Sequence, residues 1–121
     1  MIQNSNPTPS TDLCLIVPIL PGQAEAWRRF VQELQGPRQK AWQLWCRRIG
    51  TDTIQCRLQT TPQQAVVLLR ITSRDGWSLP KLVENRPFDR WLRQQIRALH
   101  GIDIAHVAAV EQLELILDIA L

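Results

Sequence analysis

Arg38 and Trp45 are the residues of this 121-residue chain whose types and positions most suggest ligand chemistry. Apolar residues recur at three- and four-residue steps on both sides of Gly36-Pro37, a pattern typical of two helical segments. If the helix axis roughly continues, Arg38 projects within about 20° of Trp45, so its guanidinium points toward the apolar stripe. A buried arginine needs a carboxylate or a bound anion, which makes both residues candidates for a ligand site. The alternative is that Pro37 breaks the axis and turns Arg38 outward or onto a helix carbonyl.

Three further candidates lie in a predicted helix that begins near Pro87 and ends at Gly101. His100 could serve as a general base, but a cationic histidine in the last turn also interacts favourably with the helix dipole. Asp89 could act in a ligand pocket, or it could pair with Arg93 four residues later. Arg90 belongs to a row of arginines that fits either an anion-binding surface or a solvated outer face. The row comprises Arg86, Arg90, Arg93 and Arg97.

The elements that must position these residues follow from the hydrophobic periodicity. Apolar runs or apolar-polar alternation predict strands at 13–20, 53–60, 65–71 and 113–121. Helical segments are predicted between the first two strands and between the last two. This βαββαβ order is the split βαβ arrangement of an α+β, ferredoxin-like fold, with a four-stranded antiparallel sheet and helices on one face. The first and third strands are apolar on both faces, so we expect them to be central. Residues 1–12 are predicted to be a flexible segment and 13–121 a single domain.

The sheet face that the helices leave open is predicted to be apolar. It would present Cys14, Ile16, Pro18, Val66, Leu68 and Ile116 beside Gln55, Arg57, Gln59, Arg70, Glu114 and Asp118. Such a patch is unusually apolar for a monomer, so we expect a second copy to cover it in a symmetric homodimer. Arg57 would then form ion pairs across the interface or, together with Gln59, line a pocket for a polar ligand.

Four segments of the chain resemble a family of small uncharacterised bacterial proteins: LPG (20–22), ELQGPR (33–38), LQTTP (58–62) and PFDRWLRQQIRALHGID (87–103). The resemblance spans roughly residues 13–121 and is most specific over 87–103. It implies a dimeric ferredoxin-like α+β barrel, distantly similar to antibiotic-biosynthesis-type monooxygenases, and it implies no particular reaction. The matching positions are Gly36, Pro37, Arg38, Gln59, Pro87, Phe88, Asp89, Arg90, Trp91, His100, Gly101 and Asp103. The chain departs from the family in its many Trp and Arg residues and in Arg70, where a neutral or acidic residue is expected.

Composition argues against several classes of protein. Hydrophobic residues make up 45% of the chain and charged ones 21%, as in globular proteins, and no window approaches the roughly 20 apolar residues of a membrane helix. No signal peptide is visible at the N-terminus. Three cysteines without C-x-x-C spacing favour a reducing, cytoplasmic setting over a disulfide framework or a zinc site. The two histidines are six residues apart, which is no recognised metal spacing, so we expect neither a metal nor a cofactor.

We therefore expect a homodimer that binds a small organic ligand between the sheet and the helices, with no reaction defined. The alternative is a cofactor-independent, monooxygenase-like small enzyme, with His100, Asp89 or Arg38 as the polar residue in its pocket. A nucleic-acid-binding module is disfavoured, because the predicted central strands carry no aromatic side chain on which a base could stack. The net charge of +3 is also mild for such a module.

Overall fold

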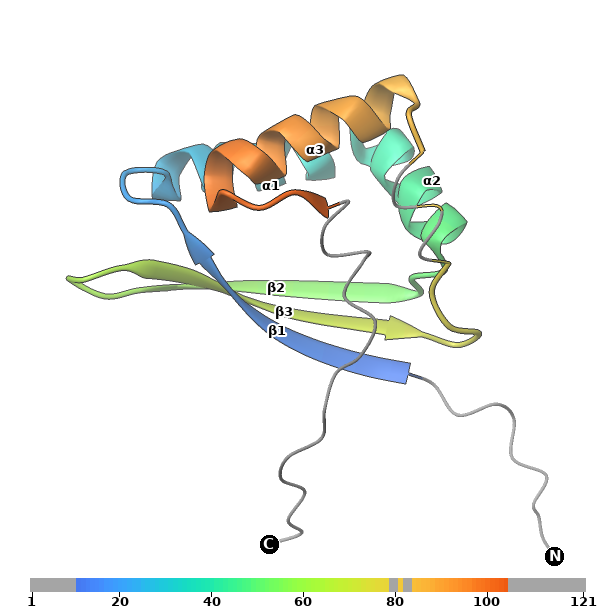
Figure 1. Cartoon of the computed structure of the whole chain (residues 1–121), viewed down its shortest axis with the longest axis horizontal. Helices are drawn as coiled ribbons and strands as arrows, with labels where there is room; N and C mark the ends of the chain where they lie inside the picture. Colours follow the sequence, from blue (N-terminus) through green and yellow to red (C-terminus); the bar gives the residue numbers. More distant parts are fainter. Residues whose placement is uncertain (1–10, 79–80, 82–83, 105–121) are drawn as a thin grey trace, which may run out of the picture.

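Six helices and strands follow one another along residues 11–78, 81 and 84–104, the part of the chain that the computed structural model describes. They are β1 (Thr11–Ile19), α1 (Ala24–Gln35), α2 (Gln39–Ile49), β2 (Thr53–Thr60), β3 (Ala65–Ser73) and α3 (Pro87–His100). All three helices lie over one face of the sheet (Figure 1), and this agrees with the expectation from the hydrophobic pattern. β1 begins at Thr11, two residues before the predicted start of the domain. The fold is a small α+β arrangement of two layers.

The sheet has three antiparallel strands in the order β1-β3-β2, so the predicted four-stranded ferredoxin-like sheet is wrong. β3 is central and pairs with β1 on one side and β2 on the other. β1 is an edge of the described sheet, although its two-sided apolar run suggested a central strand. The physical reason is that side-chain polarity reports which faces of a strand are covered, not whether another strand pairs with its backbone. On β1, three of the seven apolar side chains lie on a face that stays exposed: Cys14, Ile16 and Pro18.

Some predictions concern residues outside the described part of the chain. They are the fourth strand at 113–121, the open-face residues Glu114, Ile116 and Asp118, and residues 1–10 of the flexible segment. The three-stranded description therefore applies to residues 11–104 with the gaps at 79–80 and 82–83.

Gly36 and Pro37 separate α1 from α2, as the sequence predicts. The amides of Gly36 and Arg38 both donate to the carbonyl of Glu33, at 3.3 and 2.9 Å, which closes α1 in a tight turn. Pro37 has no N–H to donate, so the helical ladder cannot run through this turn. α2 restarts at Gln39 in a different direction (Figure 1). Because the axis does not continue, the angular projection that aligned Arg38 with Trp45 does not hold.

At the end of α2, the turn at Gly50 lies close to the turn at Gly76, and glycine makes this approach possible. Gly50 has a left-handed φ of 92°, and a Cβ at this position would lie 2.6 Å from the carbonyl oxygen of Gly76. The same turn is held by Trp77, whose Nε1 donates to Thr51 Oγ1 at 2.9 Å. The start of β2 is thereby fixed against both α2 and the loop after β3.

The core lies between the helices and the sheet face that they cover. Leu92 and Leu99 of α3 are almost completely buried in it. The C-terminal end of α3 is tied to the end of β1, because the amide of Leu20 donates to the Leu99 carbonyl at 2.8 Å. α3 ends at Gly101 in the left-handed conformation, as predicted. Among the described helices, none combines the length and the apolar character needed to cross a membrane.

Candidate ligand-binding site

A groove of about 370 Å³ lies between α2 and the start of β2, a volume within the usual range for small-molecule sites. Its apolar lining comes from Leu34, Trp42, Cys46 and Ile54. Its polar lining comes from Gln35, Gln39, Gln43, Arg47, Thr51, Asp52 and Thr53. The groove thus combines an apolar wall with several hydrogen-bonding side chains, which is the usual composition of a site for a small organic ligand.

The helical repeat of α2 places the lining residues. Gln39, Gln43 and Arg47 follow one another at four-residue steps and therefore share one side of the helix. Trp42 stacks on Trp45, with ring centroids 5.4 Å apart and planes 15° apart. Trp45 is itself buried in the core, so the indole of Trp42 is held in place as a rigid, flat wall.

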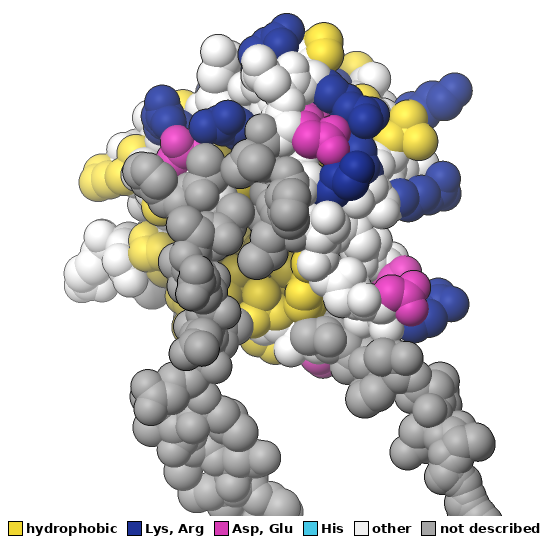
Figure 2. All heavy atoms as spheres, turned by 45° about the vertical axis from the view of Figure 1, so that its right-hand side comes forward, with side chains coloured by type: hydrophobic (Ala, Val, Ile, Leu, Met, Phe, Trp, Pro, Cys, Tyr) yellow, Lys and Arg dark blue, Asp and Glu magenta, His cyan; other side chains and the backbone are white. Residues whose placement is uncertain are grey.

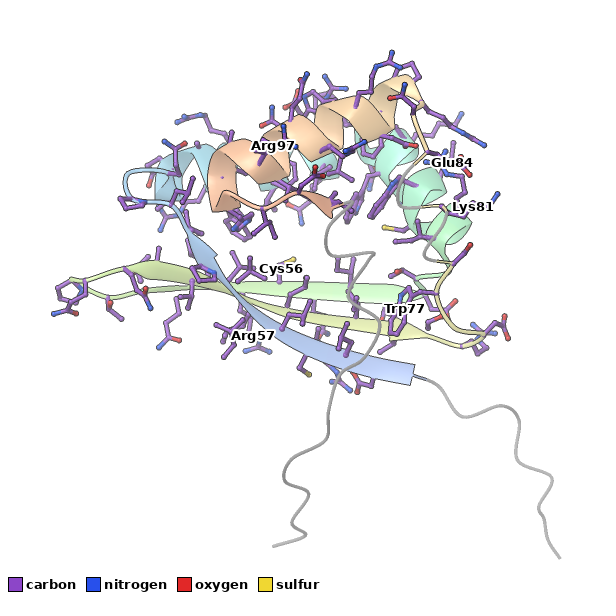
Figure 3. All side chains as sticks on the ribbon, in the orientation of Figure 1. Cys56, Arg57, Trp77, Lys81, Glu84 and Arg97 are labelled. Carbon is purple, nitrogen blue, oxygen red and sulfur yellow. The ribbon has the colours of Figure 1, made fainter. Side chains whose placement is uncertain are left out.

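The thiol of Cys46, which lines the groove, is not activated as a nucleophile. Burial raises the pKa of Cys46 to about 12, and the neighbouring Cys56 adds to the effect. The Cys56 side chain points from β2 toward the helices (Figure 3); burial raises the pKa of this thiol too, although part of the residue is exposed on the edge strand. A thiol with so high a pKa stays protonated at neutral pH and acts as a small apolar group rather than as a nucleophile.

Arg38 and Trp45, predicted to share one face, make separate contacts. Arg38 is half-buried at the start of α2, where its Nε donates to Glu33 Oε1 at 3.2 Å. Its guanidinium carbon lies 3.9 Å from the centre of the Trp91 ring, a cation–π contact. Arg38 therefore has a carboxylate and an aromatic partner within the chain, and Trp45 does not line the groove but stacks on Trp42, which does.

Asp89 is buried and joins α3 to α2. Its Oδ1 accepts a hydrogen bond from Arg48 Nη2 at 2.5 Å, and Arg48 Nε lies 3.7 Å from Glu84 Oε2. Burial alone would raise the pKa of Glu84, but the hydrogen bond from Lys81 and the surrounding positive charges outweigh it and lower the pKa. Figure 3 shows Lys81 and Glu84 beside α2. Asp89 thus belongs to an ion-pair cluster between helices, and its partner is not the predicted Arg93.

His100 and Arg90 also contact backbone carbonyls. His100 Nδ1 lies 2.8 Å from the carbonyl oxygen of Pro18, which links α3 to β1. Arg90 Nη1 donates to the Asn85 carbonyl at 2.7 Å on the outer side of α3. The structure therefore does not bring His100, Asp89 and Arg38 together around one pocket.

Arg57 and Gln59 lie on the open face of the sheet, where the expected apolar patch is present. Figure 3 shows Arg57 on the side of β2 opposite to Cys56. In the register, Arg57 is opposite Leu68 and Gln59 is opposite Val66. We call this face the open sheet face; its described residues are Cys14, Ile16, Pro18, Val66 and Leu68 with Asp12, Gln55, Arg57, Gln59 and Arg70.

One ion pair forms within the open sheet face. Arg70 Nη2 donates to Asp12 Oδ2 at 2.8 Å, from the neighbouring strand. This hydrogen bond, together with the positive charge, holds the pKa of Asp12 below its ordinary value against a weaker opposing effect of burial. Arg70, which departs from the family pattern, therefore has its partner in the same chain.

None of the seven candidate residues predicted from the sequence lines the groove. The residues that do line it were missed because the groove depends on the packing of α2 against residues 51–54, which periodicity does not reveal. One signal was available: Gln39, Gln43 and Arg47 form a polar row that runs alongside Trp42 on the same helix.

No protein-family model, curated protein sequence or solved structure matches this chain. The resemblance of residues 87–103 to the uncharacterised bacterial family therefore stays a prediction from the sequence.

Proposed function

We propose that this protein binds a small organic ligand in the groove between α2 and β2. The observation that carries the proposal is the combination of a rigid indole, Trp42, with polar side chains repeated along the same helix. A flat apolar part of the ligand would pack on Trp42, and its polar groups would accept hydrogen bonds from Gln39, Gln43 and Arg47. Because arginine binds carboxylates in a forked geometry, Arg47 favours a ligand with an anionic group.

A thermal-shift screen of small metabolites tests this proposal. A ligand at 100 times its Kd stabilises the native protein by about 2.7 kcal/mol, which is easily detected as a rise in Tm. The substitutions Arg47→Ala and Gln43→Ala are expected to reduce that rise. Matched substitutions on the outside of α1, Arg29→Ala and Gln32→Ala, remove the same chemical groups from exposed positions outside the groove and should leave it unchanged. Ligands that stabilise the groove variants as much as these controls, or a screen without any stabilising metabolite, would contradict the proposal.

The monooxygenase-like alternative has no observation in its favour. The three residues suggested for it each have a partner elsewhere in the chain. Arg38 lies on Trp91, Asp89 is paired with Arg48, and His100 is at the Pro18 carbonyl. We therefore do not extend the proposal to catalysis.

We further propose that a second copy of the chain covers the open sheet face. Ile16 is 70% exposed there, and it is opposite Leu68 in the register, between Cys14 and Pro18. The described sheet and its loops are also close to electrically neutral, because Arg57, Arg70 and Arg74 are balanced by Asp12, Asp52 and Asp75. The open sheet face itself carries Arg57, Arg70 and Asp12, a net charge of only +1. Repulsion between two copies is therefore small, and burial of the apolar side chains drives the association.

Thiol labelling gives a direct test of the covered face. Cys14 is exposed in the single chain and lies next to Ile16 on the open sheet face. In a dimer of this kind its alkylation should be slow, and the substitution Ile16→Glu should make it fast. Equal labelling rates in both proteins would contradict the proposed interface.

A reducing, cytoplasmic compartment is part of the same proposal. Cys14, Cys46 and Cys56 are all free thiols in the structure, which supports this assignment. Microscopy of a tagged full chain in the source cell would test it, and an extracytoplasmic signal would contradict it.

A further inference from the structure

The charges of the described residues are unevenly divided between the two layers. The three helices and their connections contain eleven Lys and Arg residues and five Asp and Glu residues, whereas the sheet and its loops contain three of each, counted over residues 11–78, 81 and 84–104. The whole excess of six positive charges therefore belongs to the helix layer. Figure 2 shows most Lys and Arg side chains over the upper part of the molecule, where the helices lie. A surface with such an excess attracts anionic partners over a distance of about 10 Å at ordinary salt.

The outer side of α3 gives this charge a defined shape. A groove of about 500 Å³ lies along it, with Arg90, Arg93 and Arg97 in the lining together with Asn85, Gln94 and Ala98. Arg97, labelled on α3 in Figure 3, has a largely exposed side chain. From Arg90 to Arg97 the helix rises about 10 Å, close to three residues of an extended peptide. The groove therefore offers guanidinium groups at a spacing that two carboxylates of one peptide can match.

A carboxylate of the chain itself already occupies part of this surface. Asp103 Oδ2 accepts a hydrogen bond from Arg97 Nη2 at 2.8 Å, and Asp103 Oδ1 lies 3.2 Å from Arg93 Nη2. An aspartate side chain thus fits between these two arginines. Arg90, which donates to the Asn85 carbonyl, brings a further positive charge to the groove.

We propose that the outer side of α3 is a docking surface for an acidic segment of a partner protein, whose Asp or Glu carboxylates bind Arg90, Arg93 and Arg97. Asp103 competes for Arg93 and Arg97, so the partner gains these contacts only by displacing or sharing that carboxylate. The proposal is independent of the ligand groove between α2 and β2, which lies on other residues.

An acidic peptide fits this surface better than a nucleic acid. Among the residues that the structure describes, no aromatic side chain lines the groove, so these residues offer unpaired bases nothing on which to stack. Glu84 lies beside Arg86 at one end of the helix, with 3.1 Å between Arg86 Nε and Glu84 Oε2, and Asp103 lies at the other end. These carboxylates interrupt the continuous positive track that a densely charged phosphate backbone requires. A peptide with spaced carboxylates avoids them.

Fluorescence anisotropy with a labelled poly-glutamate peptide tests the proposal on the full-length protein. We expect binding that weakens as salt is raised. Arg97→Gln or Arg90→Gln should each weaken it about three-fold, and both together about ten-fold, as for exposed charge pairs. Asp103→Asn should instead strengthen binding about three-fold, because it frees Arg93 and Arg97.

Arg57→Gln is the matched control, since it removes the same charge from the open sheet face, and it should change the affinity little. A labelled poly-glutamine peptide controls for binding that does not depend on charge. The proposal is overturned if Arg57→Gln weakens binding as much as Arg97→Gln, or if a duplex DNA binds more tightly than poly-glutamate. It is also overturned if Asp103→Asn weakens the binding while its Tm stays that of the wild type. Should Asp103→Asn fail to fold, Arg90→Gln decides, and an unchanged affinity of that variant would refute the assignment.

Discussion

The substitution Asp89→Asn tests the most buried ion pair among the residues that the structure describes. Asp89 is 2% exposed and its partner Arg48 is 15% exposed, and the hydrogen bond between them measures 2.5 Å. Replacing the carboxylate by an amide removes the negative charge that compensates the positive charge of the Arg48 guanidinium in this buried position. Removing one partner of a buried ion pair costs about 3–5 kcal/mol.

The structure places the expected loss near the lower end of that range. Glu84 remains 3.7 Å from Arg48 Nε and keeps part of the compensation. We therefore expect the free energy of unfolding to fall by about 3 kcal/mol, a large part of the roughly 5–15 kcal/mol that is typical of a domain. For a chain of this size the loss corresponds to a fall in Tm of about 10–15 °C.

Urea denaturation followed by tryptophan fluorescence measures this loss. Glu25→Gln is the control, because Glu25 is 72% exposed and pairs with Arg28 on the surface of α1, where such a pair contributes less than about 1 kcal/mol. The double substitution Arg48→Met with Asp89→Leu should recover much of the stability that Asp89→Asn loses, since it removes both buried charges. If Asp89→Asn unfolds at the urea concentration of the wild type, the pair does not hold α2 to α3, and Asp89 would again be a candidate for ligand binding.

Three further outcomes follow from single contacts. Gly50→Ala should lower the free energy of unfolding by about 1–3 kcal/mol, because the backbone is left-handed there and the new Cβ would lie 2.6 Å from the Gly76 carbonyl oxygen. An unchanged free energy of unfolding in urea denaturation would contradict this close packing. The lowered pKa of Asp12 adds stability that is complete above its ordinary value of 3.8 and is lost as the pH falls through the lower folded value, so Asp12→Asn should reduce the steepness of acid unfolding below pH 3.8. The raised pKa of Cys46 has the opposite effect on the pH dependence of stability. Its contribution to the free energy of unfolding is complete below the ordinary pKa of 9.0 and is lost as the pH rises from there toward about 12. Alkylation of Cys46 at pH 9 should accordingly be much slower in the native protein than in urea, and equal rates, measured by mass spectrometry, would contradict its burial.

Local features of the fold could be predicted from the sequence because they depend on a few neighbouring residues. Gly36-Pro37 ends a helix through the missing N–H of proline, and Gly101 ends another through its left-handed backbone. The alternation along Thr53–Thr60 likewise assigns Arg57 and Gln59 to the uncovered face of β2.

Features that depend on contacts between distant segments could not be predicted in this way. The apolar run of β1 suggested a strand flanked on both sides, whereas it reflects one covered face and one exposed apolar face. Arg38 could be placed on the Trp45 side only by assuming a continuous axis, and the turn at Pro37 instead brings it over Trp91 of a helix about fifty residues away. The groove was missed for the same reason, since residues 51–54 reach α2 through the turn at Gly50.

We propose, as the central claim, that the two layers of this molecule serve different partners and that the apolar open sheet face binds a second copy of the chain. Light scattering after size exclusion tests it most directly, on the wild type, on Ile16→Glu and on Leu44→Glu. Leu44 is the matched control, because it is a similarly exposed apolar residue, at 55%, on α2 in the helix layer. We predict a molar mass of twice 13.9 kDa for the wild type and for Leu44→Glu, and a single chain for Ile16→Glu. A wild type that is a monomer, or an Ile16→Glu variant that remains a dimer, would contradict the account.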